Sequence, residues 1–396
     1  MHSATGLAAP PELGIGTFQY WYENRHEYAR DWKERTGRKI VGAFCTYVPE
    51  EIVYAADMIT VRVFGGHEPQ DVTEPYIFGM YCPFCRDCLA QGLKGRYDYF
   101  DGLVLAHSCL HFRQTFDSWR LHIGADFDYY LPMPNQVQSP HARSYLQGEL
   151  AKFKTFLEER IGRELTDDDL DRGIAVVNEN RRLLRQIYEY RKRPNPPVTG
   201  LECMYMAITA QFVDKAEHNQ ALRAAIAEIE AGRDLNRGGT IRLLTVGSEN
   251  DDPDFLEMAE SLGATVVIDD QCAGSRFFWN EAVPQEDRLQ AIANRYCDRP
   301  ACPTKDYPER RRFPHVLGLA KDWGAQGAIV IQQKFCDPHE GDIKPLREYL
   351  ESNGIPTVFL EFDATNPLGP FRIRVEAFLE TLRNYDLFGD EDDDLF

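Results

Sequence analysis

Short runs of β-branched and aliphatic residues recur along the chain, and most are apolar at nearly every position. Strands that are buried on both faces show this pattern, because in a parallel sheet helices cover both sides. The runs predict strands at Lys39–Tyr47, Leu103–His107, Ile241–Val246, Ala264–Ile268, Ala328–Gln332 and Pro356–Glu361.

Stretches with helical spacing fall between these runs. They predict helices at Pro49–Asp57, Pro83–Gly92, Pro253–Leu262, Arg288–Tyr296 and Lys344–Asn353. Two of them open on proline with acidic neighbours, Pro49-Glu50-Glu51 and Asp252-Pro253-Asp254, which suits the first turn of a helix. The alternation of strands and helices predicts parallel sheets in doubly wound α/β domains.

The alternation stops between residues 146 and 237, where the chain is charged and helical in period. Arg191–Thr199 interrupts this region with three prolines and is expected to be a loop. The predicted organisation is a helical lead-in (1–37), a first α/β domain (38–145), a helical segment (146–237), a second α/β domain (238–385) and an acidic tail (386–396).

Composition narrows the class of protein. Of 396 residues, 43% are hydrophobic, which excludes a disordered or coiled-coil chain. The 44 Lys and Arg against 63 Asp and Glu give a net charge of −19, which excludes a nucleic-acid scaffold. Neither a signal peptide nor a membrane-spanning apolar run is present, so we expect a soluble, cytoplasmic protein with reduced thiols.

The chain has ten cysteines, and their irregular spacing does not suit a disulfide framework. Four of them follow a predicted strand or open a predicted helix: Cys82, Cys109, Cys272 and Cys336. Ligands of doubly wound sheets bind beyond the carboxyl ends of the strands. Soft thiolates beside helix N-termini suit an iron–sulfur cluster, so this placement indicates candidate cluster ligands.

Cys82, Cys85 and Cys88 read C-x2-C-x2-C, which is half of a bacterial ferredoxin signature. No fourth cysteine or Cys-Pro follows, and no second C-x2-C pair is available for a zinc ribbon. A self-contained ferredoxin module is therefore not expected. For Cys85 and Cys88 we expect helix packing or support of nearby ligands rather than ligation.

The remaining cysteines are predicted to be structural. Cys45 lies in an apolar run and Cys203 in an apolar helical stretch, so both are expected in the core. Cys297 and Cys302 flank Arg299-Pro300 and are expected to be structural residues of a loop.

Several motifs carry a family resemblance: the run from Tyr47 to Ala56, Cys82 with Arg86, Cys109 with Arg113 and Trp119, Gly247-Ser248, the run from Asp269 to Arg276, Cys302-Pro303, the run from Lys334 to His339, and Gly354-Ile355-Pro356 with Glu361. Together they resemble the 2-hydroxyacyl-CoA dehydratase / benzoyl-CoA reductase family over roughly residues 38–380. The most specific is the sequence KFCDP around Cys336.

This resemblance implies two Rossmann-like α/β domains plus helices. It also implies one [4Fe–4S] cluster, held by three cysteines on separate loops, with one iron free of cysteine. Those ligands fall on Cys82, Cys109 and Cys336, with Cys85, Cys88 and Cys272 as possible additional ones. The chain departs from the family in carrying Cys85 and Cys88, and in having Leu110 where aspartate is common. A larger or differently ligated cluster therefore stays open.

Within the family, the overall length, the sequence KFCDPHE and the segment Arg96–Cys109 resemble iron–sulfur subunits of ATP-dependent benzoyl-CoA reductases. The resemblance implies low-potential electron transfer that dearomatises an aromatic acyl-CoA to a cyclohexadiene carboxyl-CoA. It implies a heterodimer with a paralogous subunit, and separate ATP-hydrolysing iron–sulfur activator subunits. The chain itself has no G-x-x-x-x-G-K-[ST] phosphate loop.

Three histidines near the candidate ligands are possible proton donors: His107, His111 and His339. Each could equally be an ordinary surface or loop residue. Coenzyme A is a polyanion, and the basic clusters available to it are Arg181–Arg182, Arg191–Arg193 and Arg310–Arg312. Each cluster is more typical of a solvated helix or loop face.

Three other functions remain open at this stage. A 2-hydroxyacyl-CoA dehydratase subunit would bind its substrate at the open iron. A double-cubane cluster reductase would act on small molecules. A non-catalytic subunit would carry a cluster for electron transfer alone.

Overall fold

The computed structural model describes residues 12–388 of the chain. Residues 1–11 of the predicted lead-in and 389–396 of the predicted tail lie outside this range. The lead-in forms α1 (Gly16–Glu23) and α2 (Arg25–Thr36). Within residues 12–388, no helix is long and apolar enough to cross a membrane.

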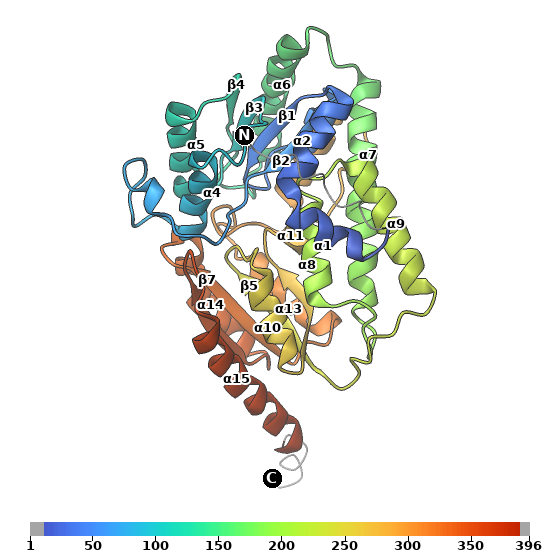
Figure 1. Cartoon of the computed structure of the whole chain (residues 1–396), viewed down its shortest axis with the longest axis vertical. Helices are drawn as coiled ribbons and strands as arrows, with labels where there is room; N and C mark the ends of the chain where they lie inside the picture. Colours follow the sequence, from blue (N-terminus) through green and yellow to red (C-terminus); the bar gives the residue numbers. More distant parts are fainter. Residues whose placement is uncertain (1–11, 389–396) are drawn as a thin grey trace, which may run out of the picture.

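The first half of the chain forms a four-stranded parallel sheet in the order β2-β1-β3-β4 (Figure 1). Its strands are β1 (Ile40–Phe44), β2 (Ile59–Arg62), β3 (Gly102–Ala106) and β4 (Phe127–Leu131). The connections carry α3 (Glu50–Ala55), the short 3₁₀ helix η1 (Asp71–Thr73), α4 (Pro83–Leu93) and α5 (Leu110–His122).

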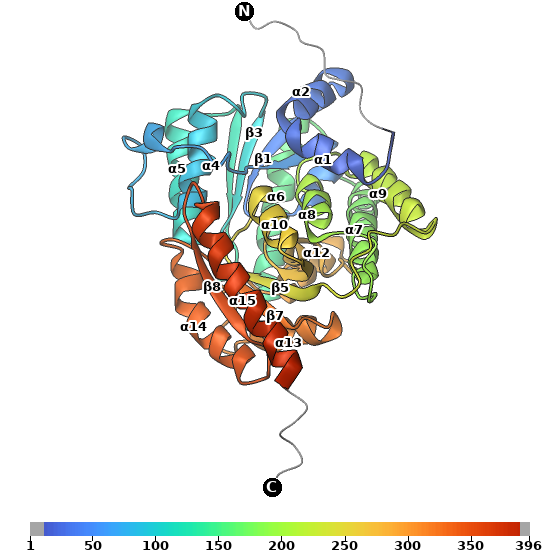
Figure 2. The same ribbon diagram turned by 60° about the horizontal axis from the view of Figure 1, so that its bottom comes forward.

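The second half repeats this topology with the order β6-β5-β7-β8 (Figure 2). Its strands are β5 (Ile241–Gly247), β6 (Ala264–Asp270), β7 (Gly327–Gln333) and β8 (Thr357–Phe362). Its helices are α10 (Pro253–Ser261), α11 (Ser275–Phe278), α12 (Arg288–Asp298), α13 (Arg312–Asp322), α14 (Asp337–Glu351) and α15 (Leu368–Phe388).

Four helices connect the two sheets: α6 (Ala142–Ile161), α7 (Asp167–Tyr190), α8 (Gly200–Thr209) and α9 (Lys215–Glu230). Thr166 and Asp169 form a capping box that fixes the start of α7. Helix α7 packs so closely on α3 that a Cβ atom at Gly173 would lie only 2.1 Å from the backbone oxygen of Glu51. The predicted loop between α7 and α8 is confirmed.

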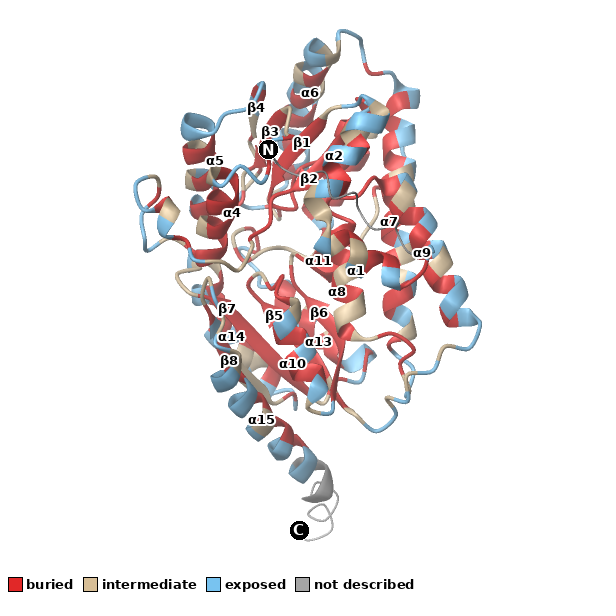
Figure 3. Ribbon diagram, in the orientation of Figure 1, coloured by how far each residue is buried: buried red, intermediate tan, exposed pale blue. Residues whose placement is uncertain are grey.

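The core runs through both sheets, and every residue of β1, β2, β3, β5, β6 and β7 except Arg242 is buried (Figure 3). The predicted fold class is confirmed: the chain is α/β, with two separate parallel sheets that are each packed with helices and joined by helices.

The sequence pattern did not predict β2 or β4, and it misplaced the end of β1 and the start of α14. β2 is only four residues long and ends on an arginine, while β4 is an edge strand with a polar, exposed position. The predicted strand Lys39–Tyr47 ends earlier, at Phe44, because Cys45 has a left-handed backbone (φ 66°). Helix α14 starts at Asp337 rather than Lys344, since Pro338 occupies its first turn and Pro345 is accommodated inside it.

Candidate iron–sulfur site

In both sheets, the direction in which the chain adds new strands reverses next to the first strand. The chain adds β2 on one side of β1 and β3 on the other, and it adds β6 and β7 around β5 in the same way. Such a switch point leaves a crevice at the carboxyl ends of the strands, where ligands bind. Residues that follow strands of both sheets line one shared cavity, so the two switch points serve a single site.

This cavity, hereafter the thiol cavity, has about 590 Å³ of empty space including its opening. Seven of the ten cysteines line it: Cys45, Cys82, Cys85, Cys109, Cys272, Cys302 and Cys336. They come from distant parts of the chain, so only the tertiary fold brings them together.

Cys82, Cys109 and Cys336 share a local position: each is the residue that caps a helix N-terminus, of α4, α5 and α14 respectively. The Sγ of Cys109 accepts a hydrogen bond from the backbone N–H of Phe112 at 3.5 Å. The positive end of a helix favours a thiolate over a thiol. The N-termini of three helices therefore favour the thiolate form of these cysteines at the thiol cavity.

The thiols of this group also form hydrogen bonds with one another. Hydrogen bonds from Cys336 and Cys85 outweigh the effect of burial and hold the pKa of Cys82 well below its usual value. A hydrogen bond from Cys85 lowers the pKa of Cys109 against the effect of burial. The pKa of the donating thiol Cys336 shifts in the opposite direction, because both its hydrogen bond to Cys82 and its burial raise it.

The C-x2-C-x2-C run divides in the structure. Cys85 was expected to pack within its helix or to support nearby ligands; it lies in the thiol cavity, where its thiol contacts both Cys82 and Cys109. Cys88 lies outside the cavity lining, fully buried, and its thiol donates to the backbone oxygen of Val63 at 3.5 Å. Burial raises the pKa of Cys88 well above its usual value.

A second group of thiols, Cys45, Cys272 and Cys302, completes the lining. Cys45 was expected in the core, and it is buried there. Cys302 was expected to be a structural loop residue. Neither expectation placed these thiols in the lining of a cavity. Cys45 follows β1 instead of lying inside it, and Cys302 lies near the start of the loop that follows α12. Burial raises the pKa of Cys272 to about 12, although the nearby Arg276 guanidinium acts in the other direction. Cys203 is buried in α8, outside the cavity, as expected.

Two charged residues of the thiol cavity were also missed. Arg62, at the end of the unpredicted strand β2, pairs with Glu249 after β5 at 2.6 Å. Both side chains are more than nine-tenths buried. Burial raises the pKa of Glu249, with Arg62 opposing it. This pair joins the two halves of the chain at the cavity wall.

The three candidate histidines occupy different environments. His111 lines the thiol cavity, and its Nδ1 accepts a hydrogen bond from the backbone N–H of Cys82 at 3.0 Å. Its Nε2 lies 3.3 Å from Asp337. His339 also lines the cavity, and burial holds its pKa well below the usual value. His107 is not part of the lining, and its Nδ1 pairs with the Tyr130 hydroxyl at 2.6 Å.

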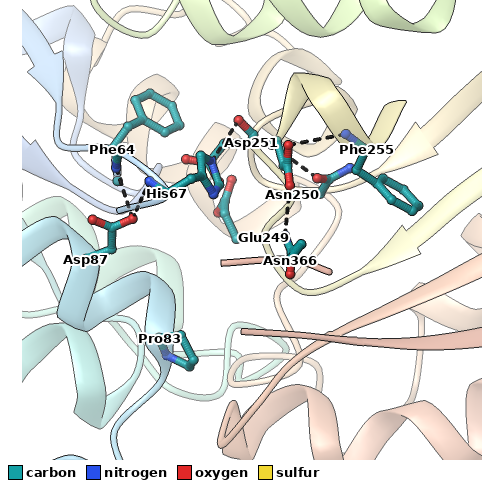
Figure 4. Close-up of polar contacts among 12 residues, drawn as sticks. Phe64, His67, Pro83, Asp87, Glu249, Asn250, Asp251, Phe255 and Asn366 are labelled. Atoms are coloured by element: carbon teal, nitrogen blue, oxygen red, sulfur yellow. Dashed lines mark hydrogen bonds and ion pairs between the residues drawn. The ribbon is translucent and has the colours of Figure 1, made fainter. Parts of the chain in front are cut away.

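Polar contacts join the two halves at one side of this region (Figure 4). Asp87 on α4 accepts hydrogen bonds from the backbone N–H groups of Gly66 and His67 at 2.9 and 2.8 Å. The His67 Nε2 lies 3.4 Å from Asp251 of the other half. Burial opposes protonation, but the Asp251 carboxylate outweighs it and raises the pKa of His67 to about 10.

The residues of the thiol cavity suit an iron–sulfur group. Soft thiolates at helix N-termini are its usual ligands. Several buried polar atoms of the lining have no partner among the described residues: Arg62 Nε, Ser108 Oγ, Glu249 Oε1, Gln333 Oε1 and His339 Nδ1. Residues 12–388 contain no group of three or more His, Cys, Asp or Glu side chains that could hold one metal ion. A cluster differs from a single ion in that each thiolate binds a different iron.

The basic clusters were expected to be solvated, and for one arginine in each this is wrong. Arg181 and Arg191 are 1% exposed, with Arg181 paired to Glu51 and Arg191 donating to the backbone oxygen of Val266. Arg312 is held between Asp270 and Asp342 at 2.7 and 2.6 Å. These three guanidiniums have structural partners.

Residues 45–382 match the family described as 2-hydroxyglutaryl-CoA dehydratase, D-component. The chain belongs to this family. Members of the dehydratase family generally carry iron–sulfur clusters, and they are catalytic subunits of dehydratases or reductases acting on acyl-CoA substrates. The thiol cavity lies within the matched residues.

Three relatives are similar along nearly their whole length. The (R)-phenyllactyl-CoA dehydratase beta subunit of Clostridium sporogenes is 27% identical, over 91% of this chain and 96% of the relative. A benzoyl-CoA reductase subunit of Thauera aromatica is 26% identical, over 90% and 94%. The (R)-2-hydroxyglutaryl-CoA dehydratase beta subunit of Acidaminococcus fermentans is 27% identical, over 87% and 93%. All three are named as subunits, so each of these relatives belongs to a multi-subunit enzyme.

Proposed function

We propose that this dehydratase-family chain is an iron–sulfur catalytic subunit of an ATP-dependent aromatic acyl-CoA reductase of the benzoyl-CoA type. A [4Fe–4S] cluster would be held by Cys82, Cys109 and Cys336, with one iron free of cysteine. The observation that carries the proposal is the convergence of these three helix-capping thiols on one cavity. The similarity to a benzoyl-CoA reductase subunit supports the substrate class.

Reducing an aromatic ring is difficult because the first added electron sacrifices delocalisation. A thioester helps, since it spreads that electron into its carbonyl group. When bound, the cluster would supply single electrons at low potential. Phe84, Phe112 and Pro338 line the thiol cavity beside the cysteines and limit the access of water to them.

Side chains of this protein would donate the protons that the reduced ring takes up. His111 and His339 both face the thiol cavity, and His111 reaches Asp337 on its other side. Of the three candidate donors, we therefore assign the protonation of a reduced ring to these two, because His107 is engaged with Tyr130 outside the cavity lining. The chain would work in a heterodimer with a paralogous subunit, supplied with electrons by separate ATP-hydrolysing subunits.

A second candidate, the double-cubane cluster reductase, has its own supporting observation. Cys45, Cys272 and Cys302 form another set of thiols in the same cavity. Arg62 and Arg276 lie close enough to influence Cys272, and their charges would offset additional thiolates. The cavity thus offers ligands for an assembly of about eight irons as well as for one of about four.

An anaerobic assay of the complete complex tests the proposal. It contains the holoprotein, its partner subunits, ATP and a strong reductant, with benzoyl-CoA in one arm and 2-hydroxyacyl-CoA in the other. We expect ATP-dependent loss of the aromatic absorbance of benzoyl-CoA. Dehydration of the 2-hydroxyacyl-CoA without ring reduction would assign the chain to the dehydratases. Iron and acid-labile sulfide counts separate the first candidate from the second.

A further inference from the structure

A buried lysine lies in the segment that carries Cys302. Lys305 is 0% exposed, and its backbone N–H donates to the backbone oxygen of Cys302 at 2.8 Å. Its ammonium donates to the backbone oxygen of Pro134, after β4, at 3.1 Å. Moving an ammonium group out of water costs much free energy unless an opposite charge compensates it. An opposite charge is therefore expected close to Lys305.

Within residues 12–388, no carboxylate forms an ion pair with Lys305. Besides its one carbonyl partner, the ammonium contacts the ring of Tyr47, whose centroid lies 5.4 Å away. By contrast, Arg62 at the wall of the thiol cavity pairs with Glu249 at 2.6 Å. Lys305 is thus a buried cation whose direct contacts are neutral.

A second buried cation faces the same ring. The central carbon of the Arg299 guanidinium lies 4.4 Å from the centroid of Tyr47. Its nitrogens donate to the backbone oxygen and the hydroxyl of Thr46 and to the backbone oxygen of Arg276, none of which carries a charge. Two positive charges without carboxylate partners therefore meet at Tyr47.

Cysteine thiols are the groups that offset the burial of Lys305. The Tyr47 hydroxyl accepts a hydrogen bond from the backbone N–H of Cys302, which lines the thiol cavity. Burial lowers the pKa of Lys305 to about 8, and the largest effects that oppose burial are those of cysteines, including Cys302 and Cys109. The ammonium therefore stays mainly protonated at neutral pH, and the thiol cavity is the side from which negative charge can reach it.

We propose that the Lys305 ammonium is a counter-charge of the thiolate-bound cluster and raises its reduction potential. The proposal rests on the proposed function for the cluster itself. Lys305 is not among the residues that line the thiol cavity, so it acts through its charge and not as a ligand. A nearby positive charge favours the form of a cluster that holds one more electron, because that form is more negative. Lys305 would thus ease the acceptance of each electron from the ATP-hydrolysing partner.

Redox titration followed by electron paramagnetic resonance tests the proposal on the anaerobically purified holoprotein, without partner subunits or substrate. Lys305→Gln removes the charge but can still donate to the backbone oxygen of Pro134, whereas Lys305→Met removes both. The matched control is Lys344→Gln on α14, where the side chain is 85% exposed and the solvent screens its charge. Iron content is recorded for each protein.

We expect both Lys305 variants to hold roughly tenfold less reduced cluster than the parent at the same applied potential, which corresponds to a midpoint lower by about 59 mV. Lys344→Gln should titrate like the parent. A midpoint like the parent's in either Lys305 variant, or an equal shift in Lys344→Gln, would overturn the proposal. Loss of the cluster from both Lys305 variants would also overturn it, because Lys305 would then support the ligands and not the potential.

The midpoint is measured without turnover, so this test is separate from the test of the proposed function. A loaded protein that shows the expected shift and reduces no aromatic thioester would overturn only the proposed reaction. Equal midpoints in a complex that does reduce benzoyl-CoA would overturn only the role of Lys305. A parent protein without iron would overturn the cluster and this inference together.

Discussion

The backbone N–H of Cys82 donates to the imidazole Nδ1 of His111 across 3.0 Å, which ties the start of α4 to the first turn of α5. His111→Ala would leave this buried N–H without its partner. We expect the free energy of unfolding to fall by about 1–3 kcal/mol, because a buried donor without a partner has given up its hydrogen bond to water and gained none in the folded protein. Anaerobic denaturant unfolding measures the change.

His141→Ala is the matched control for that substitution. His141 is exposed at the start of α6 and its side chain makes no capping hydrogen bond. We expect this control to unfold like the parent, within about 0.5 kcal/mol. Similar stabilities for the two variants would show that the contact between Cys82 and His111 does not support the site.

Two adjacent arginines in α7 give a sharp contrast. Arg181 pairs with Glu51 at 2.7 Å, with both side chains at most 1% exposed. Arg181→Met should lower the free energy of unfolding by about 3–5 kcal/mol, because it leaves a buried carboxylate without its cation. Arg182 pairs with Glu281 at the surface, so Arg182→Met should cost at most about 1 kcal/mol. Equal losses for both variants would contradict this account.

The pair of His67 and Asp251 makes stability depend on pH (Figure 4). The pKa of His67 is about 10 in the folded chain and about 6.5 when unfolded. A raised folded pKa stabilises the protein fully below pH 6.5, and this contribution is lost as the pH rises toward 10. His67→Gln should therefore lose stability mainly at low pH, and its difference from the parent should shrink between pH 6.5 and 10. A difference that is constant across this range would rule out the linkage.

The periodicity of the sequence was enough to predict the two parallel sheets, because their strands are apolar at almost every position. It could not reveal β2, whose four residues include Arg62, or the polar edge strand β4. Periodicity was also too coarse to fix where a strand ends. Cys45 was placed inside β1, although its left-handed backbone places it one residue beyond, at the cavity.

The candidate ligands were found because Cys109 and Cys336 follow strands, which sequence patterns can locate. Cys302 follows no strand, and Arg299 and Tyr47 hold its segment against the first half of the chain. No local pattern records such a contact. The N-cap role of Cys336 was not predicted either, since the predicted helix began only at Lys344, whereas the segment is helical from Asp337.

The second group of thiols gives a prediction of its own. If Cys45, Cys272 and Cys302 hold further irons, Cys302→Ala should lower the iron content of the anaerobically purified protein from about eight to about four per chain. If they hold none, this variant should keep the parent's iron content of about four per chain. Iron analysis together with acid-labile sulfide distinguishes the two outcomes. An iron content below four in Cys302→Ala would contradict both.

The most direct test of the central claim is the iron and sulfide content of anaerobically purified Cys109→Ala and Cys336→Ala, with Cys203→Ala as control. Cys203 is a buried thiol outside the thiol cavity, so its substitution removes a sulfur without removing a ligand. We predict that Cys109→Ala and Cys336→Ala lose their cluster while Cys203→Ala retains it. Full iron content in either of the first two variants would contradict the assignment.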